Sequence, residues 1–142
     1  MTKVKRLLYL ALVTVLSVVG VPMTAKAASV GTQACTIDEW GWLKDPACAG
    51  SRTTIYQTGN VALRVGSFNG QQFGWGKKYK GDYVWIRFEV DKDGDRKRDT
   101  WDYSGVKAPT YTKGYPTSSS SDRAFRVCGE RADGSGSCTP WW

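Results

Sequence analysis

The feature that most constrains the fold is the alternation of residue types after Gly50. Short runs of β-branched and aromatic residues are broken by Gly, Asn and Asp, which is typical of short strands joined by turns. No helical spacing of apolar residues is sustained there. We therefore expect an all-β fold, a small disulfide-stabilised β-sandwich or barrel of about seven short antiparallel strands. The expected strands are 53–58, 60–65, 71–77, 83–90, 98–103, 123–131 and 138–142.

The segment 83–90 is the clearest of these strands, because its residues alternate strictly in polarity. One side holds Val84, Ile86, Phe88 and Val90, and the other side holds Tyr83, Trp85, Arg87 and Glu89. We expect the apolar side to face the core, with Tyr83 and Trp85 pointing outward or into a second layer. Asn69-Gly70 predicts a tight hairpin turn earlier in the chain.

One segment, 104–122, interrupts the strand pattern with two prolines and a run of four serines at 118–121. We expect a loop there, and loops of this length in a small domain are usually functional or disordered.

The four cysteines are Cys35, Cys48, Cys128 and Cys138. An even number in an exported chain predicts disulfides, and four cysteines allow three pairings. We favour Cys35–Cys48 with Cys128–Cys138, because each pair closes a short loop. Zinc is disfavoured because the cysteines lack C-x-x-C spacing and the chain has no histidine.

The N-terminus predicts export. Lys3, Lys5 and Arg6 precede an apolar run at 7–21, and Ala25 and Ala27 supply the small residues that signal peptidase requires. We therefore expect a signal peptide at 1–27 and a secreted, extracellular protein. The mature chain would comprise an irregular N-terminal segment with a disulfide loop at 28–52 and a β domain at 53–142.

The charge and the missing histidine exclude several functions. Removal of the four basic residues in the signal peptide lowers the formal charge from +7 to +3, which is too weak a bias to indicate a nucleic-acid partner. Without histidine, Ser-His-Asp and Cys-His catalysis are excluded. We expect no enzyme, no catalytic residues and, after cleavage, no membrane association.

An acidic stretch at 91–102 resembles a calcium loop of the EF-hand type, with carboxylates at loop positions 1, 3, 5, 9 and 12. These are Asp91, Asp93, Asp95, Asp99 and Asp102. Position 6, however, is Arg96 rather than glycine, and two further cations follow it. A solvated hairpin turn is therefore the favoured interpretation, with calcium as the alternative and no other cofactor expected.

Candidate binding residues combine cations with aromatic rings. They are Lys77, Lys78, Lys80, Tyr83, Trp85, Tyr111, Tyr115, Trp141 and Trp142. Phosphate, an anionic wall polymer or an acidic protein patch would suit the lysines, whereas a solvated hairpin connection is the simpler interpretation for 77–83.

Several short motifs resemble the small exported actinobacterial and Bacillus proteins related to YjfA. They are Asp45-Pro46 before Cys48, Leu63-Arg64, Gly74-Trp75-Gly76, Gly81-Asp82 before Val84-Trp85, Cys128-Gly129-Glu130 and the ending from Cys138 to Trp142. The family often has a cysteine before the central Trp, where this chain has Gln71 and Gln72. This resemblance implies a β fold and export but no substrate.

Size, export and cysteine content also resemble the small adaptor subunits of Streptomyces umbrella toxin particles, which bridge larger secreted proteins. We accordingly favour a non-catalytic protein-binding module, in the form of an adaptor in a secreted antibacterial assembly with other secreted proteins as partners. The alternatives are a cell-wall polymer or glycan binder, and a protease inhibitor that presents Leu43-Lys44 from the loop between Cys35 and Cys48.

Overall fold

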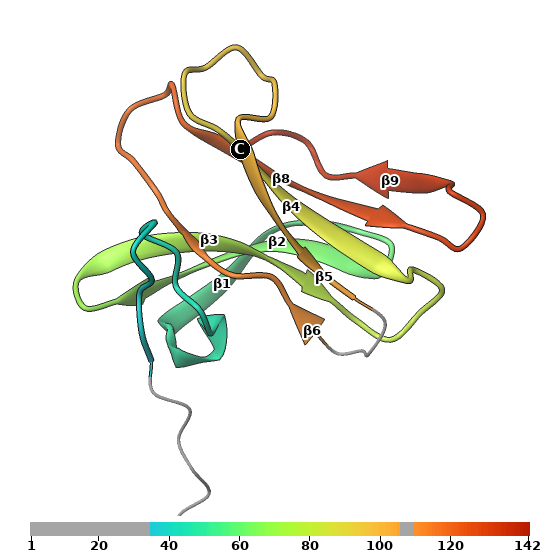
Figure 1. Ribbon diagram of the computed structural model, residues 1–142, viewed down its shortest axis with the longest axis horizontal. Coiled ribbons are helices and arrows are strands. Elements are labelled where there is room, and N and C mark those ends of the chain that lie inside the picture. The colour runs from blue at the N-terminus through green and yellow to red at the C-terminus, as the bar shows by residue number, and fades with distance from the viewer. Residues whose placement is uncertain (1–34, 106–109) are drawn as a thin grey trace, which may run out of the picture. The chain divides into compact units, whose positions relative to one another are not determined.

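The computed structural model describes residues 35–105 and 110–142, and these form two antiparallel sheets (Figure 1). The all-β prediction is confirmed, whereas the predicted signal peptide lies outside the described residues. The strands are β1 (Gly50–Thr58), β2 (Val61–Phe68), β3 (Gln71–Lys78), β4 (Trp85–Asp91), β5 (Thr100–Ser104), β6 (Thr110–Tyr111), β7 (Tyr115–Pro116), β8 (Ala124–Glu130) and β9 (Gly136–Cys138), and one short 3-10 helix, η1, spans Pro46–Cys48.

The first sheet has the order β1-β2-β3-β6, and β7 also pairs with β3. The hairpin between β2 and β3 turns at Asn69 and Gly70, whose φ angles are 49° and 76°. Two consecutive residues with positive φ make the type of turn that matches strand twist, and Asn-Gly adopts it readily. The turn predicted from the sequence is therefore confirmed.

The second sheet has the order β5-β4-β8-β9. Beyond β9 the chain continues along β8, because the backbone N–H of Thr139 donates to Val127 and Trp142 exchanges two backbone bonds with Phe125. The last strand, predicted over 138–142, is instead Gly136–Cys138, and the residues after it continue the hydrogen bonding to β8.

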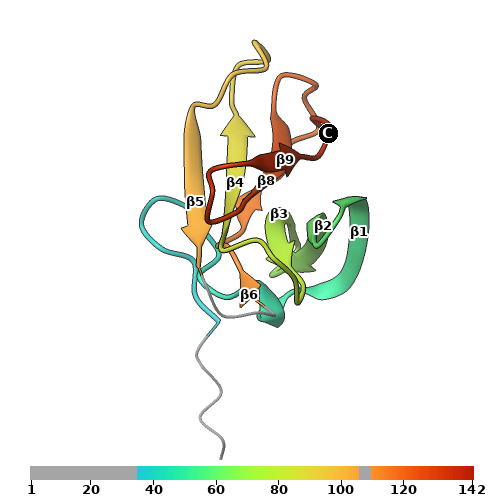
Figure 2. The same ribbon diagram turned by 90° about the vertical axis from the view of Figure 1, so that its right-hand side faces the viewer.

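The main core lies between the sheets, which appear as separate layers in Figure 2. Ile86, Phe88 and Val90 from β4 are fully buried and pack with residues of β2 and β8. The rings of Phe88 and Phe125 stack with centroids 5.5 Å apart. The apolar side expected for 83–90 is therefore the core side, with Val84 only half-buried.

A smaller cluster lies on the other side of the first sheet. Phe73 and Trp75 pack there against Leu43 and Ala49 from the N-terminal segment. Leu43 is fully buried, and its backbone N–H and C=O both bond to Gly114. The segment expected to be irregular therefore covers a sheet, held by the disulfide between Cys35 and Cys48.

The expected loop at 104–122 contains two short strands, β6 and β7, which both pair with β3. Thr112 joins the same edge, because its backbone N–H donates to Gly76 and its Oγ1 accepts from the Gly76 N–H. The prediction of a loop over 104–122 is therefore wrong at β6 and β7. An unpaired edge of β3 would leave backbone donors and acceptors unsatisfied, and the segment supplies their partners.

Both favoured disulfides are present, Cys35–Cys48 and Cys128–Cys138. Disulfides persist in oxidising environments, so they indicate a non-cytoplasmic protein. Among the residues that the structure describes, no helix has the length and apolar character needed to cross a bilayer.

Replacing Phe88 tests the core assignment. Phe88→Ala removes a fully buried ring between the sheets, so we expect the free energy of unfolding to fall by about 3–5 kcal/mol. Tyr103→Ala removes a half-exposed ring on the other side of the same sheet, and should change it by no more than about 0.5 kcal/mol. Urea unfolding monitored by fluorescence compares the two, and equal losses would contradict the assignment.

Candidate functional site

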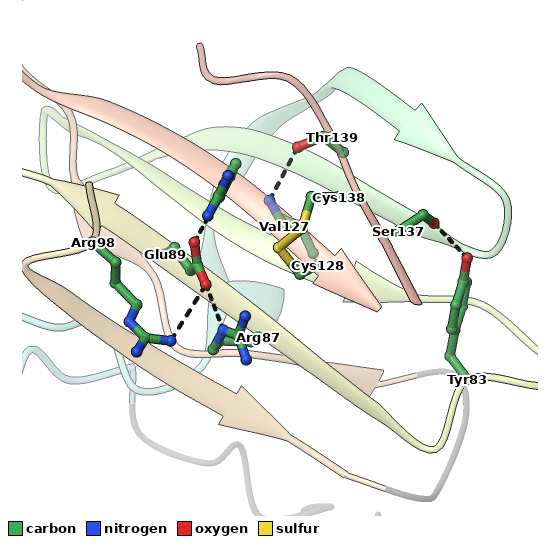
Figure 3. Close-up of a disulfide and its surroundings, with 10 residues drawn as sticks. Tyr83, Arg87, Glu89, Arg98, Val127, Cys128, Ser137, Cys138 and Thr139 are labelled. Atoms are coloured by element: carbon green, nitrogen blue, oxygen red, sulfur yellow. Dashed lines mark hydrogen bonds and ion pairs between the residues drawn. A yellow bond between two sulfur atoms is a disulfide. The ribbon is translucent and has the colours of Figure 1, made fainter. Parts of the chain in front are cut away.

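A buried carboxylate lies on the outer side of the second sheet, opposite the core. Glu89 is only 1% exposed. Its Oε1 accepts from Arg87 Nε at 2.5 Å and from Arg98 Nη1 at 3.4 Å, and its Oε2 accepts from Arg126 Nε at 2.6 Å. Figure 3 shows Glu89 between Arg87 and Arg98. The three arginines thus share one counter-charge.

The pKa of Glu89 reflects two opposing effects. Burial alone raises the pKa, because it penalises the charged form. The hydrogen bonds and positive charges of Arg126 and Arg87 outweigh burial, and the pKa lies below that of an ordinary glutamate. Glu89 is therefore ionised at neutral pH and anchors the arginines.

Each of these arginines also lies over an aromatic ring. The guanidinium carbon is 4.4 Å from the ring centroid for Arg98 over Trp101, 4.5 Å for Arg126 over Trp141, and 6.0 Å for Arg87 over Tyr103. Strand register produces this arrangement, since Trp101 and Tyr103 lie opposite Glu89 and Arg87 in the pairing of β5 with β4. Cation–π contact and the salt bridge together restrict each guanidinium.

We refer to this surface as the arginine–aromatic face. It consists of Trp85, Arg87, Arg98, Trp101, Tyr103, Arg126 and Trp141. Three of its rings are largely open to solvent, with Trp85 47%, Trp101 45% and Tyr103 50% exposed. Large rings are normally buried, so their exposure on one sheet marks this face as a candidate binding surface.

A pocket of about 270 Å³ lies at one end of the face. Trp85 and Tyr103 line it together with Glu130 and the disulfide Cys128–Cys138. The indole of Trp85 packs on Gly105, where an added Cβ would come within 2.6 Å of its Cζ3. A side chain at that position would displace the indole, so the glycine helps to place Trp85 at the pocket.

The structure contradicts two of the predicted binding residues. Lys78 is 2% exposed and its Nζ donates to the backbone oxygen of Tyr83 at 3.0 Å. Alternation along β3 puts Lys78 on the core side, with Gly74 and Gly76. Tyr83 is 4% exposed because the chain bends before β4, and its hydroxyl bonds to Ser137 (Figure 3). Neither side chain offers a surface for ligands.

The other predicted binding residues do not form one surface. Trp85 and Trp141 belong to the arginine–aromatic face, whereas Trp142 packs beside Phe125. Lys77 lies over the rings of Tyr79 and Tyr111. Lys80 is exposed, and the half-buried Tyr115 packs edge-on against Trp42. These side chains therefore lie in separate parts of the fold.

The five carboxylates of the acidic stretch also separate. Only Asp91, Asp93 and Asp99 place an oxygen within 4.8 Å of one another. Asp95 pairs with Lys97 at 2.9 Å. Asp102 lies in β5, where it accepts the Lys113 backbone N–H at 2.7 Å, and burial raises its pKa. The five-carboxylate ligand set predicted for calcium is not assembled.

Asp91 organises this turn from within. Its carboxylate accepts backbone N–H groups of Asp93, Gly94 and Arg96, and Arg96 Nη1 lies 3.0 Å from its Oδ2. Burial alone raises the pKa of Asp91, but these hydrogen bonds outweigh it and lower the pKa. The Arg96 guanidinium thus supplies the positive charge that a bound cation would supply.

Sequence reasoning missed Arg87, Glu89, Arg98, Trp101, Tyr103 and Arg126 as site residues. The alternation over 83–90 had already placed Arg87 and Glu89 beside Trp85. What the alternation does not show is which neighbouring strands lie beside it, and in which register. Trp101 and Tyr103 alternate along the predicted strand 98–103, and this signal would have pointed to them, whereas Arg98 does not share their alternation.

No family model matches this chain, and comparison with curated proteins and with solved structures finds no similar protein. The assignment of a binding surface therefore rests on the geometry of the described residues.

The buried carboxylates predict acid sensitivity. Because the folded-state pKa values of Glu89 and Asp91 are lowered, their stabilisation is complete above the unfolded-state values of about 4 and is lost as pH falls through the folded-state values. Glu89→Gln should cost about 1–3 kcal/mol at neutral pH and flatten the acid dependence. Urea unfolding between neutral and acidic pH measures both, with the exposed Glu130→Gln as control. Parallel pH profiles for wild type and Glu89→Gln would refute this role.

The turn at Asp91 predicts a melting temperature that does not depend on calcium. We expect the same temperature in calcium and in chelator, since Arg96 already neutralises Asp91. Arg96→Ala should lower the melting temperature in both solutions. Replacement of the exposed neighbour Lys92 by alanine should not lower it. A calcium-dependent rise that Asp93→Ala abolishes would show instead that the turn binds the ion.

Proposed function

We propose that the protein is an exported, non-catalytic protein-binding module that binds its partner through the arginine–aromatic face. The observation that supports this most strongly is the exposure of Trp85, Trp101 and Tyr103 beside three arginines. Trp, Tyr and Arg are the residue types most enriched at the energetic centres of protein interfaces.

Pre-organisation also supports binding by this face. Three of its four rings and two of its three guanidiniums belong to paired strands, and Glu89 forms ion pairs with all three arginines. A rigid face loses little side-chain entropy when a partner covers it.

A non-catalytic role agrees with the side chains of the face. The chain has no histidine, and Glu89 is enclosed by three arginines, so that it is not open to a substrate. A general acid or base has to come within hydrogen-bond distance of the reacting atoms.

Export and assembly belong to the same proposal. The two disulfides agree with the signal peptide predicted at 1–27. The resemblance to adaptor subunits of secreted toxin particles suggests that the partner is a larger secreted protein, and that this chain is an adaptor in an antibacterial assembly.

A glycan is the second candidate ligand. The pocket beside Trp85 combines an exposed indole with Arg87 and Glu130, and sugars stack on such rings while their hydroxyls bond to charged groups. Protease inhibition by the loop between Cys35 and Cys48 is not proposed, because Leu43 is fully buried and paired with Gly114.

Affinity purification tests the proposal. The tagged protein, expressed at native level, is recovered from the culture supernatant of its producing strain and its companions are identified by mass spectrometry. We expect larger secreted proteins in fixed ratio, lost with Trp85→Ala and Trp101→Ala but kept with Tyr56→Ala, an exposed tyrosine on the other sheet. Recovery of the protein alone, together with sedimentation on insoluble cell wall, would favour the glycan.

A further inference from the structure

We infer that the partner of the arginine–aromatic face presents an acidic polypeptide segment, whose carboxylates bind the outward N–H groups of Arg87, Arg98 and Arg126. This inference rests on the proposed function, because it names the chemistry of the protein that the face binds.

The hydrogen-bonding capacity of the arginines is the first argument. A guanidinium has five N–H donors, and each of these three reaches Glu89 through a single nitrogen. Their side chains remain 27%, 36% and 31% exposed. The forked geometry of a guanidinium matches a carboxylate, so the remaining donors suit carboxylates of a partner.

Charge is the second argument. Three guanidiniums surround Glu89, and Glu130 adds a second carboxylate at the pocket end, which leaves one positive charge in excess on the face. Glu89 is 1% exposed, so an approaching partner meets the cations and the rings rather than the anion. Glu130 lies directly opposite Trp85 in the pairing of β4 with β8. The neighbouring Arg131 and Asp82 form an ion pair and neutralise each other. The face therefore complements a negative surface.

Glu89 itself provides the third argument, because it shows how a carboxylate fits this arrangement. Its two oxygens bond to arginines from β4, β8 and the turn before β5. The rings of Trp101 and Trp141 lie against two of these guanidiniums and shield them from water on one side. Shielding strengthens a charge-assisted hydrogen bond made at the open edge.

The class of acidic ligand follows from the remaining composition of the face. Trp85, Trp101 and Tyr103 offer flat apolar area between the cations, which suits a polypeptide that alternates acidic and apolar side chains. A nucleic acid would require a broader basic surface than is provided by the charge of +3 that remains once the expected signal peptide is removed. We therefore commit to an acidic protein segment.

The test uses a fluorescein-labelled oligoglutamate peptide as the probe, with anisotropy as the readout and oligoglutamine as the neutral control. We expect binding to oligoglutamate alone, weakened by salt. Arg126→Gln and Arg98→Gln should each weaken it about tenfold, whereas Arg52→Gln, which changes an exposed arginine on β1, should have little effect. Arg126→Lys retains the charge without the fork, so it should weaken binding while the melting temperature stays close to that of wild type.

Three outcomes would overturn the inference. The first is equal loss with Arg52→Gln and Arg126→Gln, which would show diffuse attraction only. The second is tighter binding of labelled dextran sulfate or oligouridylate than of oligoglutamate, which would indicate another polyanion. The third is capture of secreted proteins that depends on Trp85 but is unchanged by Arg126→Gln and by high salt. In that case the protein-binding function would stand while the acidic partner would not.

Discussion

Strand β4 has fully buried residues on both of its sides, and the second sheet is organised around this constraint. On one side Ile86, Phe88 and Val90 pack into the core between the sheets. On the other, Glu89 is buried although it carries a charge. A buried carboxylate is tolerated only when its charge and its lone pairs are satisfied. The three arginines on Glu89 meet this requirement, and they in turn are held against Trp101, Tyr103 and Trp141.

The same constraint connects stability with binding. An isolated surface arginine samples many rotamers, and ordering it on a partner costs entropy. Here the fold has already ordered three of them, because Glu89 requires them as counter-charges. The guanidinium nitrogens that do not reach Glu89 and the exposed rings between them therefore form a rigid surface. Glu89, which stabilises the second sheet, thus also determines which cations lie on the outer side of that sheet.

Some features of the fold were predictable because they depend on local sequence. The alternation over 83–90 identified the core side of β4, and Asn69-Gly70 identified a hairpin. Lys78 and Tyr83 were placed wrongly for a physical reason. A lysine next to other cations suggests a surface, yet the pleat of β3 directs Lys78 inward, where its Nζ finds the backbone oxygen of Tyr83. The short strands β6 and β7 have too few residues to show a period, and they form because the edge of β3 needs partners.

The sequence by itself determined the all-β class and most of the strand pattern, and it favoured the cysteine pairs that close short loops. These follow from side-chain alternation, turn chemistry and chain proximity, which act over a few residues. Only the tertiary structure decided which side chains form a site. Glu89 and Arg126 are far apart in the chain and meet because β4 pairs with β8 in one particular register. A shift of one residue would turn every side chain to the opposite face, so the arginine–aromatic face exists only once the strands have paired.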